Sequence, residues 1–160
     1  MRINCSNRGV RLLVGLVVAT SPAACGGGST PTQAASTTTV TKPDRQVVDS
    51  TFFTGAGGNI GCLIDVDYVR CGIGEKDWSP PRRPAECEGD YGYNIALEPG
   101  GRAEFVCVGD SVLGQGDALA HGESIAAGPL RCDSAESSIT CRDVESGQGF
   151  SMSREAYELF

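Results

Sequence analysis

Six cysteines give the longer part of this sequence its clearest chemistry. They lie at Cys62, Cys71, Cys87, Cys107, Cys132 and Cys141. An even number of cysteines in an exported domain is typical of a disulfide framework, here of three bridges. None of the six has another cysteine two to four residues away, and the chain holds a single histidine. Because zinc sites usually close with such cysteine pairs or with histidines, we expect neither a metal nor a cofactor.

The spacing of these cysteines favours particular pairs. Two pairs have partners nine residues apart, Cys62 with Cys71 and Cys132 with Cys141. If each unit is an antiparallel hairpin, its cysteines lie directly opposite each other, because side chains alternate with a period of two. The same register pairs Ile60 with Ile73, Ile64 with Val69, Leu130 with Asp143, and Ser134 with Ile139. The pattern therefore predicts two hairpin disulfides, and elimination pairs Cys87 with Cys107 among 15 possible connectivities.

A second candidate for chemistry is Ser111, in the segment Val108–Gly114. Its Gly-Asp-Ser run resembles a block of a lipase and esterase family in which the serine is the acyl-transfer nucleophile. That resemblance implies a base beside the hydroxyl and a preformed oxyanion hole. The lone imidazole is His121, and Asp117 precedes it by four residues where that family has three. Because that family also has an α/β fold, we favour a strand end that turns at Gly109, with a hydrolase using Ser111 and His121 as the alternative.

A proline-rich segment supplies the candidate binding residues. Residues 78–84 read Trp-Ser-Pro-Pro-Arg-Arg-Pro, and three prolines exclude regular structure because each fixes φ and lacks an amide hydrogen. We expect an ordered surface loop pinned by Trp78 and Cys87. Acidic residues surround this loop, so a solvated face is the default interpretation. The functional interpretation is a recognition loop whose contact area comes from Trp78, Arg82, Arg83, Tyr91 and Tyr93.

Strands must position these side chains. Apolar patterns between glycine-rich breaks predict strands over 59–64, 68–73, 94–97, 103–108, 124–126, 129–134, 138–143 and 149–152. One helix is expected at the C-terminus, where Ser153 could cap residues 154–160. This order predicts a mainly β fold, a small disulfide-stapled antiparallel sandwich or open barrel with a short C-terminal helix.

The first 24 residues have the features of an export signal. Three arginines precede the apolar stretch 12–19, and small residues follow it. Residues 21–29, with small residues before Cys25 and a Gly/Ser stretch after it, resemble the lipobox of bacterial lipoproteins, although Pro22 stands where that family usually has Leu. The resemblance implies cleavage before Cys25 and a diacylglycerol on its sulfur, whose acyl chains (palmitate, for example) hold the protein on a membrane. The alternative is an ordinary signal peptide and a secreted protein.

Residues 25–45 separate this signal from the cysteine framework. They are rich in Gly, Ser, Thr and Pro, with almost no large apolar side chain, which predicts a flexible tether. The predicted organisation is a signal peptide at 1–24, the lipidated Cys25 and tether at 25–45, and the β domain at 46–160.

The net charge of the chain limits the classes of partner that it can bind. The net charge is −7, and removal of the three signal-peptide arginines makes it −10. Such a surface repels phosphate backbones, so nucleic acid is not expected as a partner. No uninterrupted apolar run approaches the roughly 20 residues that a membrane span needs.

Several blocks between residues 52 and 160 are similar to an uncharacterised actinobacterial domain family of exported proteins. They include FFTGAGGNIGC at 52–62, VRC ending at Cys71, WSPP from Trp78, DYG at 90–92, FVC ending at Cys107, GPLRC ending at Cys132 and the final GQGFSMSREAYELF. The entry to the first strand is one residue longer than is typical of that family. The resemblance implies export and the cysteine framework, and it implies no catalytic residue.

Together these features favour a non-enzymatic lipoprotein on the outer face of the cell membrane. Its β domain is expected to bind an envelope protein, a glycan or a small ligand, because the residues complete no catalytic set. The hydrolase described above is one alternative. A secreted protease-inhibitor-like factor is another, since small disulfide domains can present rigid exposed loops.

Overall fold

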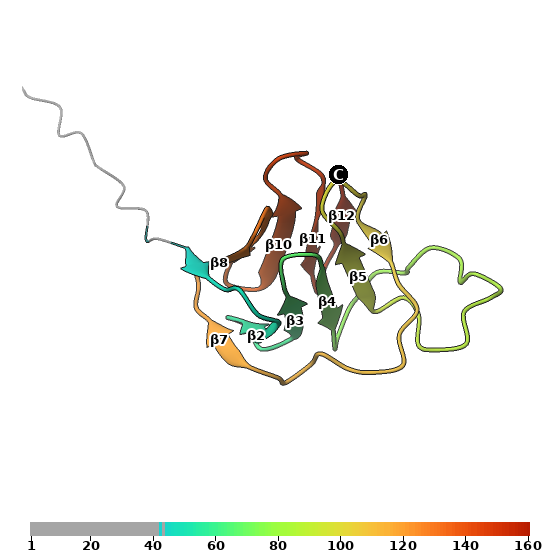
Figure 1. Cartoon of the computed structure of the whole chain (residues 1–160). Helices are drawn as coiled ribbons and strands as arrows, with labels where there is room; N and C mark the ends of the chain where they lie inside the picture. Colours follow the sequence, from blue (N-terminus) through green and yellow to red (C-terminus); the bar gives the residue numbers. More distant parts are fainter. Residues whose placement is uncertain (1–41, 43) are drawn as a thin grey trace, which may run out of the picture. The chain divides into compact units, whose positions relative to one another are not determined.

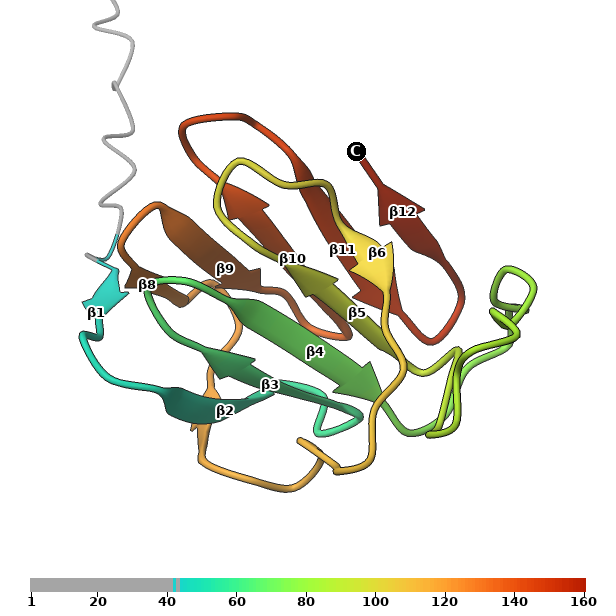
Figure 2. The same ribbon diagram turned by 45° about the vertical axis from the view of Figure 1, so that its right-hand side comes forward.

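The structure is a computed structural model that describes residue 42 and residues 44–160. The predicted signal peptide, Cys25 and most of the predicted tether lie outside the described residues. The described residues form an all-strand domain of two six-stranded sheets, with no helix among them. Figures 1 and 2 show the two sheets packed face to face, so the fold is the predicted disulfide-stapled β sandwich.

The first sheet has the strand order β1-β8-β9-β10-β11-β12. Its strands are β1 (Arg45–Gln46), β8 (Ser124–Ala127), β9 (Leu130–Ser134), β10 (Ser138–Asp143), β11 (Gly149–Ser153) and β12 (Tyr157–Leu159). β1 runs parallel to β8, and all other neighbours are antiparallel. The first and last strands of the domain therefore form the two edges of the same sheet.

The second sheet has the strand order β6-β5-β4-β3-β2-β7. Its strands are β6 (Glu104–Phe105), β5 (Asn94–Leu97), β4 (Val69–Ile73), β3 (Ile60–Ile64), β2 (Thr51–Gly55) and β7 (Asp117–Leu119). Only β2 and β7 run parallel; the rest of the sheet is antiparallel. The strand expected over 103–108 is thus limited to the two residues of β6.

The two cysteine hairpins lie at the centre of the sandwich. β3 pairs with β4 and β9 with β10, and all four register pairs are those that the spacing predicts. The disulfides are Cys62–Cys71, Cys132–Cys141 and Cys87–Cys107. The two hairpin disulfides belong to different sheets and meet in the core, where Cys71 Sγ lies 3.7 Å from Cys141 Sγ.

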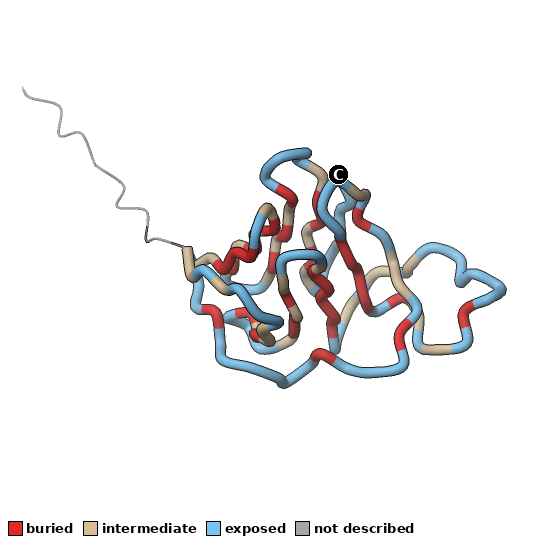
Figure 3. The backbone as a smooth tube through the Cα atoms, in the orientation of Figure 1, coloured by how far each residue is buried: buried red, intermediate tan, exposed pale blue. Residues whose placement is uncertain are grey.

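Apolar side chains surround these sulfurs. The largest fully buried ones include Phe53, Phe150, Ile95, Leu119 and Met152, which come from both sheets. Along β10 buried and partly exposed residues alternate, as expected for a strand with one face on the core. Figure 3 shows the buried residues concentrated in the paired strands and the exposed ones in the loops. The core is therefore a single layer between the sheets.

The helix expected over residues 154–160 is wrong. The chain turns after Ser153 and forms β12, which pairs antiparallel with β11. Ser153 Oγ accepts hydrogen bonds from the amides of Glu155 and Ala156, so it closes a tight turn instead of capping a helix. A helix of two turns gains little in water, whereas β12 joins an existing sheet and packs Tyr157 against Trp78.

Asp143 at the end of β10 fastens the two sheets together. Its side chain is 2 % exposed and accepts hydrogen bonds from the amide of Gly100, in the β5–β6 turn, at 2.8 Å and from that of Glu145 at 2.9 Å. The Ser146 hydroxyl donates a third at 2.8 Å. These bonds, that of Gly100 first, lower the pKa of Asp143 from 3.8 to about 2. The carboxylate is therefore a structural acceptor for two turns.

We expect Asp143→Asn to lower the free energy of unfolding by about 1–3 kcal/mol at pH 7, because the amide nitrogen that replaces one carboxylate oxygen cannot accept the hydrogen bonds of that oxygen. Since the folded-state pKa lies below the unfolded one, the stabilisation is present above pH 3.8 and is lost as the pH falls toward 2. Urea unfolding at pH 7 and pH 2 measures both effects. The matched control Asp67→Asn, at an exposed position, should leave stability unchanged at pH 7. Equal effects of the two substitutions would contradict this role of Asp143.

Candidate functional site

A strap, residues 109–116, crosses the outer face of the second sheet. Gly61 and Gly72 are register partners on β3 and β4, and they face outward because the adjacent cysteines face the core. A Cβ on Gly61 would lie 2.2 Å from the Val112 carbonyl oxygen, and one on Gly72 would lie 3.1 Å from a Val112 methyl. The two glycines therefore form a recess that receives Val112, which is 1 % exposed.

An ion pair fixes the start of the strap. Arg70 Nη1 and Nη2 each donate to a different oxygen of Asp110, both at 2.8 Å. The Arg70 side chain is 8 % exposed and that of Asp110 is 68 % exposed. The hydrogen bonds from Arg70 lower the pKa of Asp110. Arg70 Nε is buried and has no hydrogen-bond partner in the described part of the chain, so the guanidinium depends on Asp110 for its charge balance.

Beside the strap lies a pocket of about 370 Å³, which we call the Tyr93 pocket. Its lining comes from β4, β5, the strap and the segment before β5, and comprises Gly72, Ile73, Gly74, Arg83, Asp90, Tyr91, Tyr93, Asn94, Val108, Asp110, Ser111 and Leu113. Two large side chains on it are unusually exposed, Tyr93 at 46 % and Leu113 at 39 %. A concave site with an apolar rim and several polar groups is the usual form of a ligand pocket.

The proline-rich loop next to this pocket is braced at its base. The disulfide Cys87–Cys107 joins it to the chain after β6, and Asp90 and Val108 exchange backbone hydrogen bonds of 2.7 and 3.0 Å. Arg83 Nη2 donates to the carbonyl oxygens of Cys87 at 2.6 Å and Gly89 at 2.9 Å. These contacts hold the Arg83 side chain and the backbone of residues 87–90, directly before Tyr91, in place.

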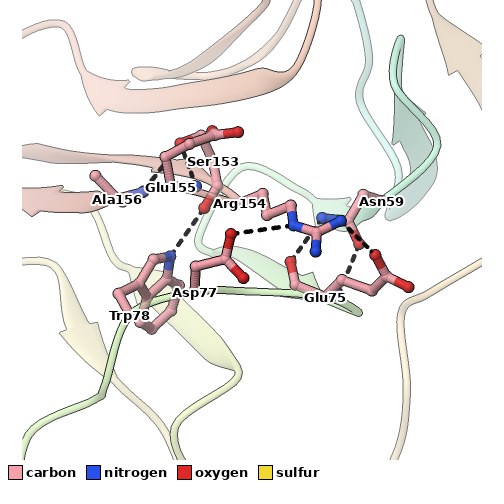
Figure 4. A network of polar contacts seen from close by, with 8 residues as sticks. All are labelled: Asn59, Glu75, Asp77, Trp78, Ser153, Arg154, Glu155 and Ala156. Atoms are coloured by element: carbon pink, nitrogen blue, oxygen red, sulfur yellow. Dashed lines mark hydrogen bonds and ion pairs between the residues drawn. The ribbon is translucent and has the colours of Figure 1, made fainter.

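The segment before the loop is tied to the first sheet, as Figure 4 shows. Arg154, in the β11–β12 turn, donates to Glu75 at 2.8 Å and to Asp77 at 3.2 Å. Trp78 Nε1 donates to the Ser153 carbonyl oxygen at 2.9 Å. The Trp78 ring also packs with Phe105 and Tyr157, at centroid distances of 5.9 and 4.7 Å. Trp78 thus holds the loop against the core and is itself partly buried.

The five predicted recognition residues therefore divide into three groups. Arg83, Tyr91 and Tyr93 line the Tyr93 pocket. Trp78 is partly buried and packs against the core, and Arg82 is exposed without a side-chain hydrogen bond or ion pair in residues 44–160. The sequence reasoning missed Asn94, Leu113 and Asp110 as pocket residues. A signal for Asp110 was present in Arg70, a charged residue inside a predicted strand that needs a partner of opposite charge when it is buried.

Ser111 and His121 are not brought together. Ser111 lines the Tyr93 pocket beside β4 and β5, and its Oγ accepts a hydrogen bond from the Leu113 amide at 3.2 Å. His121 follows β7, which is three strands away from β4, or about 14 Å at the usual strand spacing. Asp110 is held by Arg70. The Gly-Asp-Ser run thus belongs to the strap, with its aspartate in a structural ion pair.

A larger pocket of about 450 Å³ lies among the turns drawn in Figure 4. Its lining includes the glycine-rich β2–β3 turn, Asn59, Glu75 and Arg154. Arg154 already pairs with Glu75, and the Asn59 side chain exchanges hydrogen bonds with the Glu75 backbone at 2.7 and 2.8 Å. Because Asn59, Glu75 and Arg154 are bonded to one another, these three residues offer a ligand few free groups.

One family model covers most of the chain. The model described as "Family of unknown function (DUF6636)" matches residues 37–160. The chain belongs to DUF6636. The match begins before residue 52 and includes β1, so the DUF6636 domain comprises all twelve strands, the strap and the Tyr93 pocket. No curated protein and no solved structure matches the chain.

The disulfides indicate the compartment in which the DUF6636 domain is found. Three disulfides indicate an oxidising extracellular environment, because cytosolic thiols are kept reduced. The described part of the chain contains no helix that could span a membrane. Within the same residues, no three His, Cys, Asp or Glu side chains are grouped as metal ligands.

Proposed function

We propose that this protein is an extracytoplasmic binding protein whose ligand occupies the Tyr93 pocket, and that a lipid on Cys25 anchors it to the outer face of the membrane. The observation that carries the proposal is the convergence of Arg83, Tyr91 and Tyr93 with the strap around one pocket. Tyrosine and arginine are the side chains most often responsible for binding energy at recognition sites. The exposed Tyr93 is therefore the expected centre of recognition.

A binding role fits this site better than hydrolysis does. A serine nucleophile needs a base within hydrogen-bond reach, about 2.6–3.2 Å. Ser111 instead accepts a backbone hydrogen bond. His121 follows β7, the edge strand of the second sheet, three strands away from β4. Ser111 contributes a hydroxyl to the pocket wall in this proposal.

The inhibitor-like alternative is favoured by the braced proline-rich loop, on which Arg82 is exposed. A trypsin-like protease would be the expected target of an exposed arginine. Inhibition of trypsin by the mature protein, abolished by Arg82→Ala and retained in Tyr93→Ala, would favour this alternative over the binding protein.

The anchoring part of the proposal predicts an acylated N-terminus. Mass spectrometry of the protein extracted from membranes should show a mature chain that begins at Cys25 with a diacylglycerol on its sulfur. Cys25→Ala should release the protein from the membrane fraction, since acyl chains supply the attachment. An unmodified cysteine in a freely secreted wild-type chain would contradict the anchor.

The binding part predicts that Tyr93→Ala reduces retention of the mature protein on purified cell-envelope material about tenfold or more. Val144→Ala is the matched control, because Val144 is an exposed apolar residue in the β10–β11 turn, outside the pocket. Circular dichroism of both variants checks that the fold is kept. Equal retention of the two variants would overturn the pocket as the binding site.

A further inference from the structure

The chemistry of the Tyr93 pocket limits the chemical class of its ligand. We infer that the pocket binds a neutral carbohydrate, one or two sugar residues in size. This inference rests on the proposed binding function and names the class of ligand. Three properties of the pocket carry it: its charges of both signs, its mixture of donors and acceptors, and its apolar rim.

The charged groups at the pocket are of both signs, and they disfavour ionic ligands. Arg83 and Asp90 line it with opposite charges, and Asp110 is neutralised by the buried Arg70. An anion would meet the carboxylates of Asp90 and Asp110. A cation would meet Arg83 and also Lys76, whose ammonium lies over the Tyr93 ring, 4.6 Å from its centroid. An uncharged ligand meets neither repulsion.

The polar groups suit hydroxyls, which both donate and accept. Asp90 has no side-chain hydrogen bond or ion pair in residues 44–160, so its carboxylate is free to accept. Each Asp110 oxygen receives one hydrogen bond from Arg70 and keeps a lone pair. Ser111 and the tyrosine hydroxyls can donate. A ligand with several adjacent hydroxyls can use acceptors and donors on the same wall.

The rim of the pocket supplies an apolar surface that matches a sugar ring in size. Tyr93 and Leu113 are exposed on the pocket although both are large apolar residues. A pyranose ring has an apolar face of C–H groups that can cover such side chains. A tyrosine makes this contact at a small cost in conformational entropy, because it has two χ angles. The volume of about 370 Å³ lies at the small end of ligand pockets and limits the occupant to a short saccharide.

Isothermal titration calorimetry of the whole mature protein, from Cys25 to Phe160, tests this inference. The neutral probes are the methyl glycosides of glucose, mannose, galactose, arabinose and N-acetylglucosamine, with disaccharides of each. The charged probes are tri-lysine and inorganic phosphate. We expect saturable binding of at least one neutral sugar, weakened about tenfold or more by Tyr93→Ala. Tyr93→Phe, which keeps the ring, should retain most of the affinity, and Val144→Ala should retain all of it.

The failures of the two proposals are distinguishable. Tyr93-dependent binding of tri-lysine or phosphate without any sugar would overturn the carbohydrate inference and leave the pocket as a binding site. Sugar binding that Tyr93→Ala leaves unchanged would place the sugar elsewhere and overturn the inference. The absence of binding by any probe, together with unchanged envelope retention of Tyr93→Ala, would overturn both proposals.

Discussion

Replacing Cys62 and Cys71 together by alanine is expected to lower the free energy of unfolding by about 3–5 kcal/mol. Loss of loop closure contributes about 3 kcal/mol in the chain-entropy model. A further loss comes from packing, because both residues are fully buried and Cys71 Sγ touches Cys141 Sγ of the opposite sheet at 3.7 Å. Urea unfolding under non-reducing conditions, followed by circular dichroism, measures the change.

The third disulfide provides the matched control for this prediction. Cys87–Cys107 closes a longer segment, 20 residues against nine, so its loop-closure contribution is slightly larger. Cys107 is exposed, however, and Cys87, although buried, lies outside the core cluster, so their removal leaves no cavity in the core. The Cys87→Ala/Cys107→Ala variant should therefore lose less stability and mainly loosen the braced loop. A larger loss in this variant than in the core variant would contradict the stapled-core account.

Asp110→Ala is expected to lower the free energy of unfolding by about 2–4 kcal/mol, although Asp110 is itself mostly exposed. The cost arises at Arg70, which is buried and loses the one charged partner that it has among the described residues. Water can reach the vacated position, which keeps the cost below that of a fully enclosed pair. The strap should also loosen, and with it the wall of the Tyr93 pocket.

A double-mutant cycle separates this cause from a general sensitivity of the strap. Arg70→Met with Asp110→Ala removes both charges and should recover most of the stability lost in Asp110→Ala. Asp90→Ala, an exposed carboxylate on the same pocket without an ion pair in the described residues, should change stability by no more than about 0.5 kcal/mol. If the double variant is less stable than Asp110→Ala, the buried charge is not the cause.

The cysteine hairpins were predictable because two independent patterns agree on their register. Apolar residues with a period of two define the inward face, and the nine-residue spacing places the cysteines opposite each other on that face. Ile60 with Ile73 and Leu130 with Asp143 follow from the same register. Asp143 was the exception to the apolar face, and the structure shows that turn amides satisfy its buried carboxylate.

Four strands were missed, β1, β2, β7 and β12, and most of them have little local signal. β1 and β7 are two and three residues long and each pairs in parallel with a strand distant in sequence. β12 lies in a segment whose capping serine and apolar spacing also fit a helix. In each case pairing with an existing strand supplies the stability, and this contribution does not appear in the segment's own residues.

The site was predictable only where its residues stand out in the local sequence. Arg83, Tyr91 and Tyr93 stand out near a proline-rich loop, so composition alone points to them. Leu113 and Asp110 become pocket residues only because Gly61 and Gly72 allow the strap to cross the sheet. That contact joins segments about 40 to 50 residues apart, and no short pattern encodes it.

The most direct test of the binding site is a fragment screen that follows the backbone amides of the mature protein by NMR. Such a screen detects binding of small molecules of any chemical class. The account predicts that bound fragments shift the amides of Tyr91, Tyr93, Asn94, Ser111 and Leu113, and that Tyr93→Ala removes these shifts. Shifts that concentrate at the turns around Arg154, or the absence of any cluster of shifts, would contradict it.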